Sequence, residues 1–564
     1  MNVLTLTALV CIGTLQVFAD ETIYSPFSIV SFHELPHQTI CRIFSNGRSL
    51  LWNVRLVLIA IVVIWNTSDY SSHLFVLNLY VQVIDGGSTG SRLHIFEFVT
   101  TNATTGETDC VRRGSERSHK PLSYFGRTNT SVALNATYVA DHMIHLFEYA
   151  ATIIPEEYHM STTVRYAATA GMRLLDPDEQ EAVYDALYDG LMEFDSFVFQ
   201  SMQREDISTL SGELEGFYGA VAANFLVGAI DTKLKTNNDE EASHGPLGAL
   251  DMGGSSTQIV YLPGNKRDEE TCKEDSQTCH AHFEVPDRLN GDDFFSTSYL
   301  AYGVDQFRER LWDTWVSDQE KSGSLHQISN PCANHGYSLE WKGYTLIGTG
   351  DAEACAVQVR RLIPHHEPDR ESQLGGKVGG VEHPPLRGKF FAMSLYFFSL
   401  DSLRVLSHRA KDAYHALNSS WPNPSIAELY NALDGLCGRS WHDDLEHDDH
   451  GHAFTRAEVL PHRCLEAVYM VTLLKDGFGF EWESRDITFT FLVDGSEVEW
   501  SLGMALSMHA DEQVGKQNHQ QRSAVNVTVE IEIEHKNLES FIVLPGPLDG
   551  RELDEHKVLS RTSM

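Results

Sequence analysis

Two segments of the chain share one pattern of apolar and polar positions. Residues 83–96 read VIDGGSTGSRLHIF, and residues 249–262 read ALDMGGSSTQIVYL. In each, an apolar strand ends in an aspartate, glycine and hydroxyl residues follow, and a second apolar strand begins. Glycine adopts backbone angles that other residues avoid, so each segment predicts a β-hairpin with a tight turn. The repetition indicates a duplicated structural unit.

The stretch between the hairpins predicts one strand and two helices. Residues 163–171, TVRYAATAG, have a strand pattern that ends in small residues. A helix follows, with Asp176 as its N-cap and Pro177 at its first position. A second helix is expected within residues 210–228, LSGELEGFYGAVAANFLVG, with these apolar side chains on one face: Leu214, Phe217, Tyr218, Val221 and Phe225.

The hairpin turns have a chemistry that suits phosphate. Such turns gather backbone N–H groups and hydroxyls around one point, which favours an anion. Asp85 and Asp251 stand at strand ends, where carboxylates can hold a hydrated divalent cation. One hairpin alone is explained by an ordinary solvent-facing turn, whereas two matching hairpins favour phosphate chemistry. Thr169 either packs in its strand or reaches a phosphate, and Glu215 either complements its helix dipole or serves as a base.

Composition narrows the class of partner. The chain has 564 residues, enough for several domains or one large two-lobed enzyme. Its 42% of hydrophobic residues exclude wholesale disorder. The formal net charge of -37 argues against a nucleic-acid partner, which requires a basic surface. A small anionic substrate is compatible with this charge if its pocket is locally positive or bridged by a metal.

Several signals predict the secretory pathway. Residues 1–19 resemble a signal peptide, although the usual positive start is missing. The run LVLIAIVVIW at 56–65 is too short to span a bilayer alone, so it is either a buried strand or, as the second choice, a short amino-terminal anchor. Asn-X-Ser/Thr sequons are candidate glycosylation sites in a secreted protein: Asn66, Asn102, Asn129, Asn135, Asn418 and Asn526.

Cysteines and acidic residues supply further candidates. Nine cysteines in an oxidising compartment should pair and leave at least one over, and Cys41 and Cys110 lack obvious partners. The run HDDLEHDDHGH at 442–452 has no regular ligand spacing, so a solvated acidic loop is preferred to a metal site. Proximity in the chain predicts the disulfides Cys272–Cys279, Cys332–Cys355 and Cys437–Cys464.

The ordered motifs resemble the nucleoside triphosphate diphosphohydrolase (apyrase) family, most like its cell-surface branch. Besides the two hairpins they include AATAGMRLL, LSGELEGFYGAVAANFLVG and FFAMSLYFFSLDSL, over about residues 81–508. The resemblance implies an α/β, actin-like two-lobed fold, in which each lobe has a ribonuclease-H-like mixed sheet flanked by helices and the active site lies in the interlobe cleft. The implied divisions are an uncertain segment 20–80, lobe I at 81–210, lobe II at 211–490, a return to lobe I at 491–510 and a polar tail at 511–564.

The resemblance also implies roles for individual residues. The activity would be stepwise removal of terminal phosphate from nucleoside tri- and diphosphates, dependent on Ca²⁺ or Mg²⁺ held through water by Asp85 and Asp251. Glu215 would be the catalytic base, and Ser256 and Gln258 would position the attacking water. Phe398 would present an aromatic ring to the nucleobase. The phosphates would be bound by Ser88, Thr89, Gly90, Thr169, Gly253, Gly254 and Ser255.

Some positions depart from the family pattern. Ala220 stands where the family usually has Trp, Gly86 replaces Ala and is expected to loosen the first turn, and Leu146 stands where a cysteine partner of Cys110 is expected. These departures leave a catalytically impaired nucleotide-binding protein as the alternative. An exopolyphosphate phosphatase would not need Phe398, and a sugar or glycerol kinase would seldom carry so many sequons.

Overall fold

The computed structural model describes residues 79–102, 107–126, 134–237, 246–263, 285–322, 326–364, 378–447, 451–493 and 495–513. Contacts divide the chain into residues 1–75 and 76–564, and every described residue belongs to the second unit. The signal-like segment, the apolar run at 56–65 and the pair Cys272–Cys279 lie outside the described residues. Within the described residues, no helix combines the length and the apolar character needed to cross a bilayer.

The first hairpin forms the centre of a five-stranded mixed sheet. β1 (Leu79–Gly87), β2 (Gly90–Asn102) and β3 (Glu107–Ser118) are antiparallel neighbours, whereas β4 (Thr163–Ala168) and β5 (Ile207–Thr209) run parallel to β1 on its other side. The strand order is β3-β2-β1-β4-β5. The parallel pairing brings the ends of β1 and β4 to one edge of the sheet, beside the hairpin turn.

The second hairpin forms the centre of a second sheet with the same topology. β6 (Gly248–Met252), β7 (Ser256–Tyr261) and β8 (Phe295–Leu300) are antiparallel neighbours, and β12 (Phe390–Ser394) and β13 (Ile487–Phe489) continue in parallel. The order is β13-β12-β6-β7-β8. The shared topology confirms the duplication predicted from the hairpins, and with it the α/β, actin-like fold of two mixed sheets flanked by helices.

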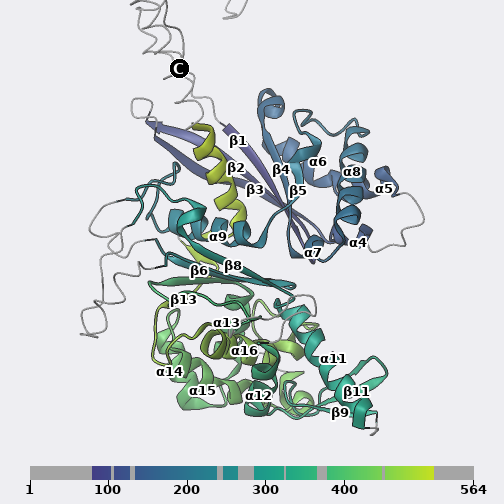
Figure 1. Ribbon diagram of the computed structural model, residues 1–564, viewed down its shortest axis with the longest axis vertical. Helices are drawn as coiled ribbons and strands as arrows, with labels where there is room; N and C mark the ends of the chain where they lie inside the picture. The colour runs from purple at the N-terminus through teal and green to yellow at the C-terminus, as the bar shows by residue number, and fades with distance from the viewer. Residues whose placement is uncertain are drawn as a thin grey trace, which may run out of the picture. The chain divides into compact units, whose positions relative to one another are not determined.

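Helices cover the outer face of the first sheet (Figure 1). We call this sheet, together with its helices, lobe I. Alternate residues of β1 and β2, such as Ile84 and Leu93, share a core with these helices. The long helix among them begins as predicted, with Asp176 as its N-cap and Pro177 in its first turn. The helices are α4 (Ser123–Gly126), α5 (Ala136–Asp141), α6 (Ile144–Ile153), α7 (Ala170–Arg173) and α8 (Pro177–Met192).

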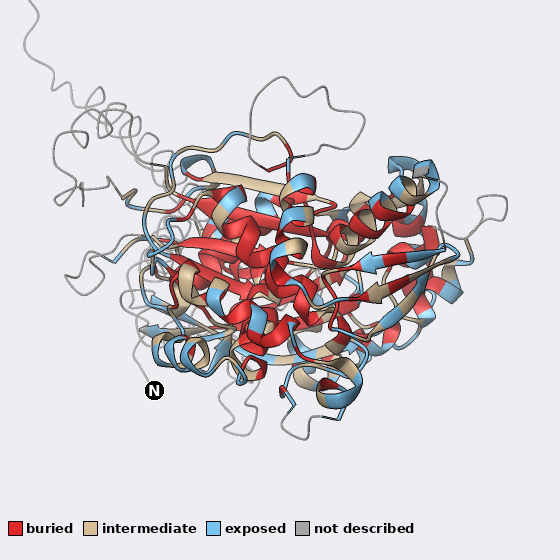
Figure 2. Ribbon diagram, turned by 90° about the horizontal axis from the view of Figure 1, so that it is seen from below, coloured by how far each residue is buried: buried red, intermediate tan, exposed pale blue. Residues whose placement is uncertain are grey.

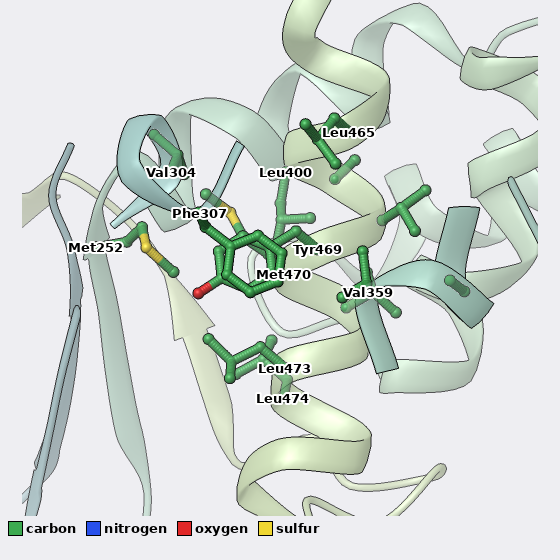
Figure 3. Close-up of a cluster of buried hydrophobic side chains, with 14 of the residues drawn as sticks. Met252, Val304, Phe307, Val359, Leu400, Leu465, Tyr469, Met470, Leu473 and Leu474 are labelled. Atoms are coloured by element: carbon green, nitrogen blue, oxygen red, sulfur yellow. The ribbon is translucent and has the colours of Figure 1, made fainter. Parts of the chain in front are cut away.

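The second sheet and its helices form lobe II, where the largest core lies. The rings of Phe307 and Tyr469 stack there with centroids 3.8 Å apart, among the aliphatic side chains shown in Figure 3. A small sheet lies at the margin of the lobe, in the order β10-β11-β9. The elements are α11 (Val304–Ser322), β9 (Gln327–Asn330), β10 (Ser338–Trp341), β11 (Tyr344–Gly348), α12 (Ala352–Leu362), α13 (Leu395–Leu406), α14 (Lys411–Ser420), α15 (Ile426–Cys437) and α16 (Arg463–Thr472).

The cysteine predictions can be compared with the described residues. The disulfides Cys332–Cys355 and Cys437–Cys464 are both present, as predicted. Cys110 is free. Cys110 and Leu146 pack into cores on opposite faces of the first sheet, because Cys110 contacts the core of Val81 and Val83 whereas Leu146 belongs to the outer core.

Helix α9 (Gly212–Leu226) lies between the two sheets (Figure 1). The prediction of one apolar face is wrong in part, because Leu214 is 44% exposed while Gly216, Ala220 and Asn224 are buried. A helix enclosed on two sides needs small or packed residues all round, so a one-sided apolar stripe does not describe it. Figure 2 shows the buried residues running through the centre of the molecule. Ala220 is fully buried in the core that α9 shares with both sheets.

The described chain ends against the first sheet. A small hairpin of β14 (Leu492–Val493) and β15 (Ser496–Glu497) precedes a helix over residues 500–513. Trp500 and Ala505 of this segment pack in the same core as Phe96 and Phe98 of β2. Residues that follow lobe II in the sequence thus complete the inner face of lobe I.

Candidate active site

The two hairpin turns face each other across a cleft of about 990 Å³. A Cβ atom added to Gly254 of the second turn would lie 3.1 Å from Ser88 Oγ of the first. Gly90 and Gln258 are buried and do not line the cleft. The other predicted site residues all line it: Asp85, Ser88, Thr89, Thr169, Glu215, Asp251, Gly253, Gly254, Ser255, Ser256 and Phe398.

Packing fixes the first turn. Gly87 pairs with Gly90, so Ser88 and Thr89 form its loop. Gly90 has a φ of +149°, and a Cβ there would overlap the carbonyl oxygen of Ser118. The expectation that Gly86 loosens the turn is wrong, because Gly86 lies inside β1 and a Cβ there would come within 2.8 Å of the Tyr166 ring. Glycine at this position makes room for that buried ring.

The amino terminus of α11 holds the second turn in place. The Val304 N–H donates to the Gly253 carbonyl at 3.0 Å, and the Asp305 N–H donates to the Gly254 carbonyl at 2.9 Å. The carbonyl groups of Gly253 and Gly254 are therefore both bound to a helix of lobe II. The turn is presented to the cleft as a fixed backbone loop.

Asp85 and Asp251 lie near the carboxyl ends of β1 and β6, the central strands of their sheets, and both line the cleft. Burial raises the pKa of Asp85 to about 7; the Arg92 guanidinium opposes this increase, and the Glu499 and Asp251 carboxylates add to it. Burial also raises the pKa of Asp251, against the effect of a hydrogen bond from Ser394. Asp85 Oδ1 is buried without a hydrogen-bond partner. Two carboxylates beside one space, with an unpartnered oxygen, have the donor chemistry that hard divalent cations prefer.

The three predicted catalytic residues form one hydrogen-bonded group. Glu215 lies in the first turn of α9 and is 8% exposed. Gln258 Nε2 donates to Glu215 Oε2 at 3.1 Å and to Ser256 Oγ at 2.9 Å. Gln258 and Ser256 lie two positions apart on β7, so both side chains point to the same side of the second sheet. A water bound beside Ser256 would lie within reach of the same group.

Two residues that the sequence analysis did not assign complete this group. Arg173 donates through Nη2 to Glu215 Oε2 and through Nη1 to Ser298 Oγ at 3.2 Å. Burial raises the pKa of Glu215 to about 8, and the Arg173 guanidinium opposes that increase. Arg173 stands in the AATAGMRLL motif, and its place close after Thr169 was the available signal. Ser298 lies in an unremarkable strand sequence and offered none.

Phe398 belongs to an aromatic cluster that lines the cleft. Its ring centroid lies 5.5 Å from those of both Phe454 and Phe491, which are 5.2 Å from each other. Phe454 is 45% exposed, so the cluster presents aromatic surface to solvent. The sequence indicated Phe398 alone, because Phe454 and Phe491 come from two other segments whose proximity only the fold creates.

Five arginines share the cleft lining with its carboxylates: Arg92, Arg117, Arg308, Arg456 and Arg463. Arg92 and Arg117 stand directly opposite each other on β2 and β3, where like charges destabilise a sheet. Arg92 pairs with Glu499 at 2.7 Å, whereas Arg117 donates to Thr89 Oγ1 of the first turn at 3.1 Å. Positive charge therefore lies beside the turn that is expected to meet phosphate.

The acidic run at 442–452 is partly a structural element. Arg439 donates to both carboxylate oxygens of Asp444, at 2.9 and 2.7 Å, and His452 Nε2 lies 2.9 Å from Asp401 Oδ2. The side chains of Asp444 and His452 are only 9% and 2% exposed, so the prediction of a solvated loop is wrong for these two residues. Across the described part of the chain, no three or more His, Cys, Asp or Glu side chains gather in a group that could hold a metal ion.

Comparisons with known proteins agree with this geometry. The pattern of the GDA1/CD39 (nucleoside phosphatase) family matches residues 77–526. The chain is 26% identical to the Golgi apyrase of Saccharomyces cerevisiae over 75% of its own length and 69% of that protein, and 26% identical to the ectonucleoside triphosphate diphosphohydrolase 1 of Mus musculus over 76% and 80%. The solved structure of nucleoside triphosphate hydrolases from Neospora caninum has the same fold, with a TM-score of 0.58 and 15% identity over 82% of this chain and 97% of that one.

Proposed function

Because the chain belongs to the GDA1/CD39 (nucleoside phosphatase) family, we propose that it hydrolyses nucleoside triphosphates and diphosphates, releasing terminal phosphate stepwise down to the monophosphate. One observation carries this proposal: both aspartate hairpins and the group of Glu215, Gln258 and Ser256 meet at one cleft. The names of the yeast and mouse relatives, an apyrase and a triphosphate diphosphohydrolase, support the same substrate class.

The two turns bind the phosphates in this proposal. Ser88 and Thr89 of the first turn, Thr169, and Gly254 and Ser255 of the second turn supply hydroxyl and N–H donors. Gly90 is buried beside the cleft and the Gly253 N–H donates to the Ser256 carbonyl at 2.9 Å, so these two glycines shape the turns that bind the phosphates. Phe398 stacks on the nucleobase, together with its aromatic neighbours. Every base has a π-face, so stacking discriminates weakly among bases and broad nucleotide specificity is expected.

Glu215 is the base that takes a proton from the attacking water. Ser256 orients that water from the wall of the cleft, and Gln258 helps from behind it by donating to both Ser256 and Glu215. Phosphoryl transfer passes through a loose transition state in which positioning and electrostatics dominate. A positioned base contributes about 10²–10⁴-fold to such a reaction. The group of Glu215, Gln258 and Ser256 therefore supplies both the base and the orientation of the attacking water.

Asp85 and Asp251 fit a divalent cation, Ca²⁺ or Mg²⁺, held through its waters. The unpartnered Asp85 Oδ1 and the all-oxygen character of the pair support this assignment. When bound, the cation neutralises charge on the phosphates. The carboxylates themselves fix its place at the ends of β1 and β6, and its charge favours their ionised forms despite their burial.

The decisive experiment measures inorganic phosphate released from ATP, ADP and AMP. The purified protein is assayed with Ca²⁺, with Mg²⁺ and with a chelator. Release from ATP and ADP but not AMP, lost in chelator, is the expected result. Nucleotide binding without release from any of the three would overturn the proposal and leave a binding protein.

We also propose a location in the secretory pathway. The Golgi apyrase and ectonucleoside triphosphate diphosphohydrolase names of the relatives support it, as do the two disulfides. Amino-terminal anchoring by residues 56–65 stays a prediction that expression with and without this segment, followed by membrane fractionation, would test.

A further inference from the structure

Arg173 joins lobe I to the catalytic group across the cleft wall. It ends α7, directly after the β4 strand of lobe I, and its side chain is 14% exposed. One guanidinium nitrogen contacts Glu215 on α9, and another reaches Ser298 on β8 of lobe II at 3.2 Å. The planar fork of arginine suits two separate acceptors, which lysine cannot match.

Ser298 connects Arg173 to the other arm of the group. Gln258 and Ser298 are directly paired on β7 and β8, and Gln258 Nε2 lies 3.0 Å from Ser298 Oγ, so its two N–H groups are shared among Ser298, Ser256 and Glu215. The Ser298 hydroxyl therefore accepts from both Arg173 and Gln258. Arg173, which holds Glu215, and Gln258, which holds Ser256, therefore share the Ser298 hydroxyl as one acceptor.

The start of α9 is shaped to admit this arrangement. A Cβ added to Gly212 would overlap the Ser298 side chain and the Arg173 guanidinium. At Gly216, one turn later, a Cβ would lie 2.6 Å from Val260 Cγ2 and 3.2 Å from Gln258 Cβ. Glycine is a poor helix former, so its use in the first turns of a buried helix carries a cost that the close approach of these side chains explains.

We propose that Arg173 and Ser298 are positioning residues for hydrolysis: together they hold Glu215 and, through Gln258, Ser256 at the geometry in which one water meets both. This inference rests on the proposed function and adds to it. Neither residue lines the cleft, so the effect of the pair falls on turnover more than on substrate binding. Misplacing a reacting group by about 1 Å is enough to cost a reaction about 100-fold.

Ser298→Ala tests the hydroxyl, with Ser296→Ala as the matched control. Ser296 lies two residues earlier on the same strand and donates to the Glu213 carbonyl of α9 at 2.6 Å, so it contacts the same helix without bonding to the side chains of the catalytic group. For Ser298→Ala we expect kcat for ATP to fall about 10-fold with KM within about twofold, because one hydrogen-bond acceptor of two buried donors is lost. Ser296→Ala should leave kcat within about twofold of the parent protein.

Two substitutions of Arg173 separate the effect of its positive charge from the effect of the two-acceptor geometry of its guanidinium group. In Arg173→Met the acidic limb of the pH profile of kcat/KM moves to higher pH, because the guanidinium that opposes the raised pKa of Glu215 is gone; Asp251 and Asp85, which raise that pKa, remain. In Arg173→Lys the limb stays near its original place while kcat falls about 10-fold, because one ammonium cannot reach both acceptors. Thermal unfolding of each variant verifies that it is folded.

The outcomes distinguish this inference from the proposed function. A parent protein that releases no phosphate from ATP contradicts the proposed function. An active parent in which Ser298→Ala and Ser296→Ala have equal kcat, or in which Arg173→Met leaves the pH profile in place, contradicts the positioning role alone. A folded Ser298→Ala variant with reduced kcat, unchanged KM and an active Ser296→Ala control supports it.

Discussion

Replacing Glu215 with glutamine should abolish turnover and at the same time stabilise the metal-free protein. Glutamine keeps the shape of the side chain and its oxygen acceptor, but it cannot take a proton from water. Removing a positioned base lowers kcat by about 10²–10⁴-fold. The stability gain has a separate origin, the burial of the carboxyl group between α9 and the second sheet.

The size of the gain follows from the pKa of Glu215. Burial raises this pKa from 4.5 to about 8, so the folded protein binds the proton more tightly than the unfolded chain does. Ionisation therefore destabilises the folded state: the cost is absent below about pH 4.5, grows as the pH rises, and is complete above about pH 8. At about 1.4 kcal/mol per pH unit, the cost at pH 8 exceeds that at pH 5 by about 3 kcal/mol.

Glu215→Gln removes this pH-dependent cost, and at pH 5 the buried carboxyl group is protonated and as neutral as the glutamine amide. The pH dependence of the difference therefore isolates the carboxyl group. We would measure urea unfolding of the parent and the variant at pH 5 and pH 8 in chelator, because a bound cation would itself favour the ionised form. The variant should gain about 3 kcal/mol relative to the parent between the two pH values.

Glu213→Gln is the matched control, because Glu213 is the exposed acid of the same helical turn. It should retain phosphate release and show no pH-dependent gain. A Glu215→Gln variant that still hydrolyses ATP at the parent's rate would refute its role as the base. A stability difference that is the same at pH 5 and pH 8 would refute the reasoning about its burial.

Three further predictions follow from the cleft and the surface. Phe398→Ala should raise KM for ATP about 10-fold in steady-state assays, because the nucleobase loses its stacking partner. Hydrolysis of inorganic tripolyphosphate, which has no base, should be unchanged. Arg117→Gln should raise KM more for ATP than for ADP, because the longer phosphate chain carries more charge toward the first turn. The control Arg361→Gln, an exposed change on α12, should alter neither KM value. Equal effects of the two substitutions would contradict the assignment of Arg117. Peptide mapping of secreted protein should find glycan at Asn135, whose Oδ1 caps α5 at 3.0 Å from the Tyr138 nitrogen, rather than at Asn418, whose Nδ2 already donates to the Tyr414 carbonyl at 2.9 Å; glycan at Asn418 alone would reverse this ranking.

The hairpins, and through them the fold, could be predicted from the sequence because their determinants are local. The aspartate, the glycines and the alternating strands of VIDGGSTGSRLHIF lie within one short stretch, which is enough to specify a hairpin with a two-residue loop. The same holds for the start of α8, where Asp176 and Pro177 are adjacent. The repetition of the hairpin then predicted the two similar sheets.

The remaining features depend on contacts between distant segments. Ser298 meets Arg173 only because β8 and α7 approach the same end of α9. Phe454 and Phe491 join Phe398 from two separate segments. The sequence alone suggests that Gly86 makes the turn flexible, because it does not show that the Tyr166 ring occupies the space where a Cβ would be. In each case the missing information was the identity of a neighbour in space.

The helix over residues 500–513 has a consequence for the synthesis of the protein. Its side chains cover Phe96 and Phe98, which leave the ribosome several hundred residues earlier. Until that helix has emerged, the inner face of β2 lacks its cover and exposes apolar surface of the kind that chaperones bind. Lobe II can meanwhile close its own large core, which contains no residue of the first sheet. The outer core of lobe I, made of residues 80–207, can also close early, so the inner face of the first sheet should be completed last and catalysis should begin only after the late helix docks.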